Sequence, residues 1–410
     1  MTSRERIRAA LQHKMPDMLP IDFAAHRSSG IAAVSYNRLK RHLGFAEETT
    51  RLYDLMQQLA MPEPCVLDRL GGDVQQVYQL KPAFGVSIDR WKPGKLTDGT
   101  PCQLPYGFNP VVNPDGSEDI VDPELGPIAR RPANGLYFDS TRYYLEGVED
   151  VEELKEKLVL PTISEAELDF LEKQAKDLYE NSDKALLMHV GCAVFEQGQQ
   201  DFGYEDFYYN LAAEPEIIHY WGEKMTEARL VMLDKILERV SPYIDVALFG
   251  GDDMGTQIAP QMSTKMYREM IKPYQKAMYQ FVHQKAPNVA VGLHSCGAIR
   301  PLIPDIIDAG VDVLNPIQVS ATGMDPRELK KEFGRDLVFW GGGADMQGFV
   351  SAHADPKEVY NHTRGLIEIL AQDGGFVFTQ VHNILADIDP ARILAIYQAA
   401  LDFRKEQGSI

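Results

Sequence analysis

Short apolar runs alternate with longer amphipathic stretches along the chain, and no segment repeats at a fixed period. The short runs are rich in Val, Leu and Phe, and several lack polar alternation, which is typical of strands buried on both faces. The predicted strands are Leu19–Phe23, Val74–Leu80, Ala185–Val190, Val246–Phe249, Val289–Leu293, Val311–Leu314, Leu337–Trp340 and Phe376–Thr379.

The stretches between these runs carry helix start signals. Ser263 opens one helical stretch, and three Asp-Pro pairs, at Asp325, Asp355 and Asp389, each place a capping residue before a first-turn proline. Strand–helix alternation indicates a parallel sheet, and about eight strands favour a closed (β/α)₈ TIM barrel. The alternative is an open doubly wound sheet, which lacks support because no glycine-rich phosphate fingerprint follows the first strand.

One segment interrupts this alternation. Residues 81–165 are rich in Pro, Gly, Asp and aromatic residues, and Asn113-Pro114-Asp115-Gly116 is typical of a tight turn. We therefore expect residues 1–410 to form a single barrel domain with a β-rich insertion between strands 2 and 3. Loops that follow barrel strands surround the active site, so the insertion is a candidate lid. The alternative is that the insertion has no role in the active site, or that it forms a dimer contact.

Polar residues follow nearly every predicted strand. The carboxyl ends of barrel strands meet at one mouth, so these residues are expected to cluster there and form the active site. The candidates, in chain order, are Arg27, Asp252, Asp253, Gln257, His294, Cys296, Asn315, Gln318, Gly342, Asp345 and His382.

His294 and Cys296 are the candidates with metal-binding character. Two residues spaced i, i+2 at a strand end point to the same side, and imidazole nitrogen with thiolate sulfur suits Zn²⁺. His382 is the natural third ligand, and Gln318 would add an oxygen. The alternative is a buried cysteine beside a hydrogen-bonded histidine.

Asp252 and Asp253 form a paired carboxylate, which raises one pKa and suits a general acid or base. Their alternative is a helix cap or a solvated turn. Arg27 is a candidate for holding a substrate carboxylate or phosphate, and its alternative is a surface salt bridge. The remaining strand-end candidates are expected to bind substrate: Gln318, Asn315, Gly342, Asp345 and Gln257.

Composition narrows the functional classes. The net charge is −19 and no long Lys/Arg run is present, which argues against a nucleic-acid partner. No stretch approaches 18 consecutive apolar residues, so no membrane span is expected. The four cysteines are widely spaced and the first residues lack an apolar signal region, so we expect a cytoplasmic protein.

The chain resembles the uroporphyrinogen decarboxylase superfamily over nearly its whole length apart from the insertion. The resemblance is carried by Thr2–Arg6, Ser263–Pro273, the His-Ser-Cys-Gly motif at 294–297, Ala309–Asp312 and the end from Gly374 to Pro390. The decarboxylases themselves carry an R-Q-A-G-R-Y signature after strand 1 and an F-S-D motif after strand 2. Here the first place reads His-Arg-Ser-Ser-Gly from residue 26, and the second falls near residue 80 with only an upstream aspartate retained. Porphyrin decarboxylation is therefore not expected.

Within the superfamily, the chain is most similar to the zinc-dependent corrinoid (methylcobamide) methyltransferase branch. That branch holds zinc with a His-x-Cys motif and a later Cys, and His294 and Cys296 match the motif. His382 stands in place of the later Cys, and Gln318 stands where the methionine synthase type has a Glu ligand. The resemblance implies Zn²⁺ and a corrinoid such as methylcobalamin, carried on a small corrinoid-binding protein or used as a co-substrate.

The implied activity is methyl transfer to or from a small molecule, as in a demethylation pathway, and a homodimer is expected from the same resemblance. One alternative is a decarboxylase or other lyase acting on a small carboxylated substrate, with Asp252, Asp253 and Arg27 handling the acid group. Another is a non-catalytic metabolite- or corrinoid-binding protein.

Overall fold

A seven-stranded parallel sheet forms the centre of the protein in the computed structural model, which describes residues 1–352 and 355–408. Its strand order is β15-β14-β13-β12-β11-β10-β3, so neighbours in the sheet follow each other along the chain. The predicted strands are confirmed, with ends within a few residues of the expected ones. The strands are β3 (Val74–Val77), β10 (Ala185–Gly191), β11 (Val246–Phe249), β12 (Ala290–His294), β13 (Val313–Asn315), β14 (Val338–Trp340) and β15 (Phe376–Val377).

The segment around Ile21 supplies the eighth position and closes the sheet. Ile21 forms a parallel bridge with Phe378, just beyond β15. On its other side the Ile21 carbonyl accepts the backbone N–H of Asp73, next to β3, at 2.7 Å. The first and last strands of the sheet are therefore joined through one short segment, and the TIM-like barrel is confirmed.

Side chains alternate between the inside and the outside of this sheet, as the strand period requires. One buried cluster joins Val74, Leu187, Val246, Leu248 and Val338, which come from different strands. The intervening strand residues pack outward against the helices in a second, larger cluster. Burial on both faces explains why the strands are almost continuously apolar.

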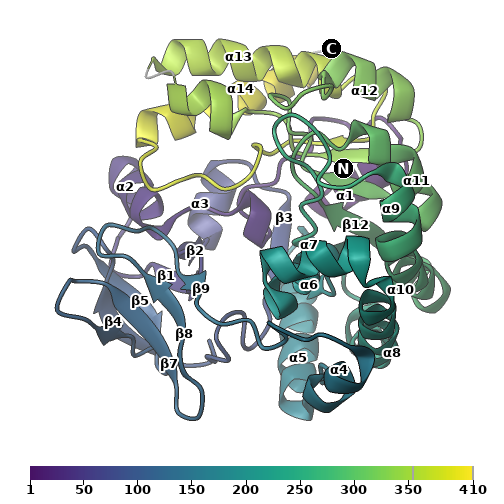
Figure 1. The fold of residues 1–410 in the computed structure, drawn as a ribbon. Coiled ribbons are helices and arrows are strands. Elements are labelled where there is room, and N and C mark those ends of the chain that lie inside the picture. The colour runs from purple at the N-terminus through teal and green to yellow at the C-terminus, as the bar shows by residue number, and fades with distance from the viewer. Residues whose placement is uncertain (353–354, 409–410) are drawn as a thin grey trace.

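Helices surround the sheet (Figure 1). The predicted caps are confirmed: side-chain oxygens of Ser263, Asp325, Asp355 and Asp389 accept first-turn backbone N–H groups. The helices are α1 (Ser3–Leu11), α2 (Ala33–Leu43), α3 (Pro64–Arg69), α4 (Val151–Lys157), α5 (Glu165–Asn181), α6 (Phe195–Phe202), α7 (Tyr204–Ala213), α8 (Pro215–Val240), α9 (Thr264–Met266), α10 (Lys272–Lys285), α11 (Ile303–Ala309), α12 (Pro326–Phe333), α13 (Pro356–Leu370) and α14 (Pro390–Gln407).

The β-rich insertion between barrel strands β3 and β10 is present. It contributes to two four-stranded sheets, of order β2-β1-β5-β4 and β6-β7-β8-β9, which lie beside the barrel at the lower left of Figure 1. Two of these strands precede β3 and were missed in the sequence pattern, because each is only three or four residues long. The strands are β1 (Arg51–Asp54), β2 (Leu59–Met61), β4 (Trp91–Lys95), β5 (Pro101–Pro105), β6 (Val111–Val112), β7 (Glu118–Asp122), β8 (Gly126–Arg131) and β9 (Asp139–Ser140).

Across residues 1–352 and 355–408, no helix combines the length and the hydropathy that crossing a bilayer requires.

Candidate metal centre at the barrel mouth

Three of the predicted ligands come together where the strands end. His294 is the last residue of β12, Cys296 lies two residues further, and His382 follows β15 in a left-handed backbone conformation (φ 62°). Their ligand atoms all lie within 4.8 Å of one another. The Cys296 sulfur is 3.5 Å from Nε2 of His294, and the two histidine rings are 6.0 Å apart at their centroids. Such a group can hold one metal ion.

Asn315, the last residue of β13, determines how His294 presents its ring. The Asn315 amide nitrogen donates to the Trp340 carbonyl at 2.7 Å, so its oxygen faces Nδ1 of His294, 2.6 Å away. Because that oxygen can only accept, Nδ1 carries the proton and Nε2 is directed at Cys296. Metal-binding histidines have this arrangement, with the second nitrogen fixed by a hydrogen bond. The donor set and its orientation therefore fit Zn²⁺.

Asp253 lies against the same group. Its Oδ1 accepts the backbone N–H of Cys296 at 2.7 Å and is 3.3 Å from Nε2 of His294. Burial opposes charge on both side chains, but their attraction prevails: the pKa of Asp253 is lowered and that of His294 is raised. Burial raises the pKa of the Cys296 thiol to about 11, and Asp253 adds to this. A metal ion bound here would displace protons from His294 and Cys296.

His382 and His189 differ from His294 in charge. Burial, followed by the proximity of His294, lowers the pKa of His382 to about 4. Burial likewise lowers the pKa of His189, on β10, to about 3, and Arg27 contributes. Both rings are therefore neutral at neutral pH, which is the form in which histidine binds a metal.

Asp252 has a different role from its neighbour. Its carboxylate accepts backbone N–H groups of Val194, Phe195 and Glu196 at 2.7–3.1 Å and the side-chain amide of Gln275 at 2.8 Å. Asp252 therefore caps the first turn of α6, although it lies on a different segment of the chain. This role is similar to the helix cap given above as the alternative to an acid or base. Burial raises the pKa of Asp252, while these hydrogen bonds oppose the rise.

Glu196 is a site residue that the sequence reasoning missed. Its Oε1 accepts the backbone N–H of Asp253 at 3.1 Å. Burial, then the charges of Asp253 and Asp252, raise the pKa of Glu196 to about 7. A Cβ at Gly251 would lie 2.5 Å from the Glu196 carboxylate, so the glycine leaves room for it. The signal available in the sequence was a glutamate in the first turn of the helix after barrel strand 3.

Arg27 lies near the mouth but is engaged by the insertion sheet. Its Nε is 2.5 Å from the buried carboxylate of Asp54 on β1, and Nη2 contacts the sulfur of Met56. The guanidinium also contributes to the lowered pKa values of His189 and His382. Arg27 therefore places positive charge close to His189 and His382, while its Nε is paired with Asp54.

The remaining candidates mostly hold backbone or one another. Gln318 accepts the Gly297 N–H at 2.6 Å and donates to Gln347, to which Gln257 also donates. Asp345 accepts two N–H groups in the helical turn Met346–Val350. At Gly342 (φ 89°) a Cβ would lie 2.9 Å from Ile317, so close packing accounts for this glycine. These contacts shape the mouth around the three-ligand group.

Comparison with known proteins identifies the family. The model of the uroporphyrinogen decarboxylase (URO-D) family matches residues 192–403. This range carries five of the seven strands of the barrel sheet and both His294 and Cys296. The chain belongs to this family. The resemblance predicted from the sequence is thereby confirmed at the level of the superfamily.

The curated relatives match only part of the chain. The uroporphyrinogen decarboxylase of Chlorobium limicola is 28% identical over 188 residues, covering 44% of this chain and 49% of the relative. That of Chlorobaculum tepidum is 24% identical over 199 residues, covering 46% and 53%. The chain thus spans about half the length of these relatives.

A solved structure extends the likeness to the whole fold. A methyltransferase from Methanosarcina mazei superposes with a TM-score of 0.60, covering 98% of this chain and 99% of its own, at 15% identity. At 15% identity the match establishes a shared fold, and the superposed region includes the insertion. It does not show that the two proteins have the same activity.

Proposed function

We propose that this protein is a zinc-dependent methyltransferase that acts with a small corrinoid-binding protein and moves a methyl group to or from a small molecule. The observation that carries the proposal is the group of His294, Cys296 and His382, with Nε2 of His294 directed into it by Asn315. The likeness to the methanogen methyltransferase supports it. Cytoplasmic location and a homodimer stay predictions.

Zinc held by these three residues would act as a Lewis acid that lowers the pKa of a bound thiol or hydroxyl. One thiolate and two neutral histidines form a less anionic set than one with two thiolates. The site therefore suits a hydroxyl, water or folate-type substrate better than a thiol. Three ligands leave a fourth position for that substrate.

The protein's own groups would orient the ligands and exchange protons. Asp253 fixes the backbone of Cys296, and Gln318 fixes the next residue, so the ligand loop is held from two sides. Glu196, with a pKa of about 7, can accept or release a proton near neutral pH. We assign Glu196 the role of proton acceptor for the bound substrate.

The alternative is a carboxy-lyase, which the curated relatives favour. Two of its expected acid-handling residues are already engaged, because Asp252 caps α6 and Asp54 pairs with Arg27. A lyase would therefore have to bind its carboxylate with groups other than these, and the methyltransferase is the better supported proposal.

Metal content tests the site directly. Purified protein should contain about one zinc per chain by mass spectrometry, and His294→Ala, Cys296→Ser and His382→Ala should each lose most of it. Two exposed residues provide matched controls, His42→Ala and Cys65→Ser, which should retain zinc. Zinc-free wild type, or ligand variants that keep full zinc, would refute the metal centre.

Turnover separates the two activities. Loss of the methyl group from methylcobalamin, followed by its absorption spectrum, should depend on zinc and on His294. Release of carbon dioxide from small carboxylated substrates without a zinc requirement would instead support the lyase. Ligand binding without either reaction would support a non-catalytic protein.

A further inference from the structure

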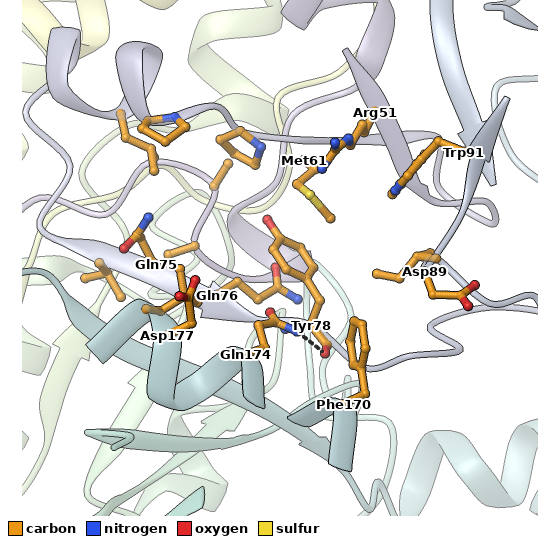
Figure 2. Close-up of a pocket in the computed structure, with 18 residues that line it drawn as sticks. Arg51, Met61, Gln75, Gln76, Tyr78, Asp89, Trp91, Phe170, Gln174 and Asp177 are labelled. Carbon is orange, nitrogen blue, oxygen red and sulfur yellow. Dashed lines mark hydrogen bonds between the residues drawn. The ribbon is translucent and has the colours of Figure 1, made fainter. Parts of the chain in front are cut away.

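A cavity lies beside the barrel, apart from the metal group. Its volume is about 430 Å³, within the range of small-molecule sites. It is bounded by β3, α3 and α5, by β1 with Arg51, and by β4 with Trp91. Neither a metal-group residue nor Asp253 or Glu196 lines it. Its apolar walls come from Met61, Leu67 and Phe170, among others (Figure 2).

One side of the cavity presents hydrogen-bond acceptors. Gln75 and Asp177 are drawn together at the left of Figure 2. Oε1 of Gln75 is buried and has no hydrogen-bond partner, which is costly unless a ligand supplies a donor. The Asp177 carboxylate accepts from Asn181, one turn along α5, and has no cationic partner within 4.0 Å in the described part of the chain. This side therefore favours an ammonium or another N–H group.

The opposite side presents a cation and an aromatic ring. The Arg51 guanidinium lies over the Trp91 ring, 5.3 Å from its centroid, and within residues 1–352 and 355–408 no carboxylate forms an ion pair with it. Asp89 also lines the cavity, but its carboxylate turns outward in Figure 2 and accepts from Ser87 at 2.6 Å. This side favours a carboxylate stacked near an aromatic group.

The wall between the two sides is preformed. Gln174 on α5 bonds both backbone groups of Tyr78, accepting from its N–H at 2.7 Å and donating to its carbonyl at 3.0 Å. The Tyr78 ring packs edge-on against the Tyr53 ring, with 4.7 Å between the ring centroids. Tyr78 thus presents a fixed aromatic surface to a flat ligand, and Phe170 lines the cavity with it.

We propose that this cavity binds a small zwitterion whose ammonium and carboxylate lie at opposite ends of a planar apolar body, of the chemical class of the (aminoalkyl)benzoates. The ligand's ammonium faces Gln75 and Asp177, its carboxylate faces Arg51, and its ring lies against Trp91, Tyr78 and Phe170. The site is separate from the proposed methyl-transfer centre, so its occupancy does not depend on zinc.

Binding to the purified protein is measured with 4-(aminomethyl)benzoate as the probe, by calorimetry and by tryptophan fluorescence. Of the three tryptophans, Trp221 and Trp340 are fully buried, so the fluorescence change comes from Trp91. Benzylamine lacks the carboxylate and 4-methylbenzoate lacks the ammonium, and each should bind at least about fivefold more weakly than 4-(aminomethyl)benzoate. Trp91→Phe should remove the fluorescence change.

Substitutions assign each end of the ligand. Arg51→Ala should weaken the binding of 4-(aminomethyl)benzoate and 4-methylbenzoate at least about fivefold and leave that of benzylamine unchanged. Asp177→Asn should weaken the binding of 4-(aminomethyl)benzoate and benzylamine to a similar extent and leave that of 4-methylbenzoate unchanged. Both side chains are exposed, so the fold should survive, as checked by circular dichroism. The matched control is Arg90→Ala, since Arg90 lies over Tyr106 outside the cavity and should change nothing.

Two results would overturn the proposal. The first is the absence of saturable 4-(aminomethyl)benzoate binding up to about 10 mM. The second is binding that neither Arg51→Ala nor Asp177→Asn weakens. Because the experiment reads binding alone, it remains decisive whether or not the protein proves to be a methyltransferase.

Discussion

At the scale of single residues, Asn315 controls the chemistry of His294 without being one of the three ligands. Its amide is anchored by the Trp340 carbonyl and holds the proton on Nδ1 of the histidine ring. Removing the amide would free the ring to rotate or to change tautomer, either of which spoils Nε2 as a ligand.

We predict that Asn315→Ala lowers zinc affinity by about 10- to 100-fold, the usual effect of losing a group that orients a metal-bound histidine. Competition with a chromogenic chelator measures the affinity. The exposed Asn288→Ala is the control and should match wild type. Equal affinities in the two variants would show that Asn315 does not position the ligand.

Gly297 is required by the close approach of two loops. Its φ is 91°, and a Cβ there would lie 2.3 Å from the backbone of Gly255. We predict that Gly297→Ala lowers the free energy of unfolding by about 2–3 kcal/mol and displaces Cys296, so that zinc is lost as well.

Gly147 provides the comparison for Gly297. It has a similar positive φ of 74° but open space around the missing Cβ. Gly147→Ala should therefore cost only about 1 kcal/mol, the conformational penalty alone, and should retain zinc. Urea unfolding measures both variants, and equal costs would contradict the steric explanation.

At the scale of elements, Asp305 ties α11 to the preceding helical segment. Its carboxylate accepts from Arg268 at 2.9 Å and from Lys272 at 2.8 Å. The hydrogen bond from Arg268, helped by Lys272, lowers the pKa of Asp305 below its usual value of 3.8, although burial opposes this.

A depressed carboxylate pKa stabilises the fold above the unfolded-state pKa, and the contribution is lost as the pH falls through the folded-state pKa. We predict that Asp305→Asn lowers the free energy of unfolding by about 1 kcal/mol at pH 7. The difference from wild type should shrink below pH 3.8. Urea unfolding across this range is the measurement, and a difference independent of pH would show that the carboxylate charge is not responsible.

At the scale of the whole molecule, one buried carboxylate joins the two ends of the chain to the barrel. Asp73 pairs with Arg6 of α1 at 2.7 Å and with Arg404 of α14, and it accepts the backbone N–H of Ile21 at 2.9 Å. The same Ile21 segment closes the sheet. Asp73 therefore links closure of the barrel to the docking of both terminal helices.

Asp73→Ala leaves Arg404 buried without its carboxylate partner and leaves Arg6 with Asp17 alone. Removing one partner of a buried ion pair typically costs about 3–5 kcal/mol. We predict a loss of that size, measured by urea unfolding. The nearby Asp68 pairs with Lys184 at 2.9 Å but is 67% exposed, so Asp68→Ala should change stability by less than about 1 kcal/mol. Similar losses for the two variants would contradict the linking role of Asp73.

The sequence alone determined the barrel strands, the helix caps and the residues that gather at the mouth. Apolar runs indicate buried strands, and Asp-Pro pairs indicate where helices begin. The carboxyl ends of parallel barrel strands meet at one mouth whatever the details of side-chain packing. His294, Cys296 and His382 could therefore be assigned to one site before any contact was known.

Only the tertiary structure decided what each charged group at the mouth does. Asp252 and Asp253 are adjacent in sequence, yet one caps α6 and the other contacts His294. Glu196 joins the site, and Asp54 engages Arg27, through contacts between segments far apart in the chain. Such contacts depend on how separate elements pack against one another. Hydrophobic periodicity indicates that an element is buried, but it does not indicate which polar group of another element will contact it.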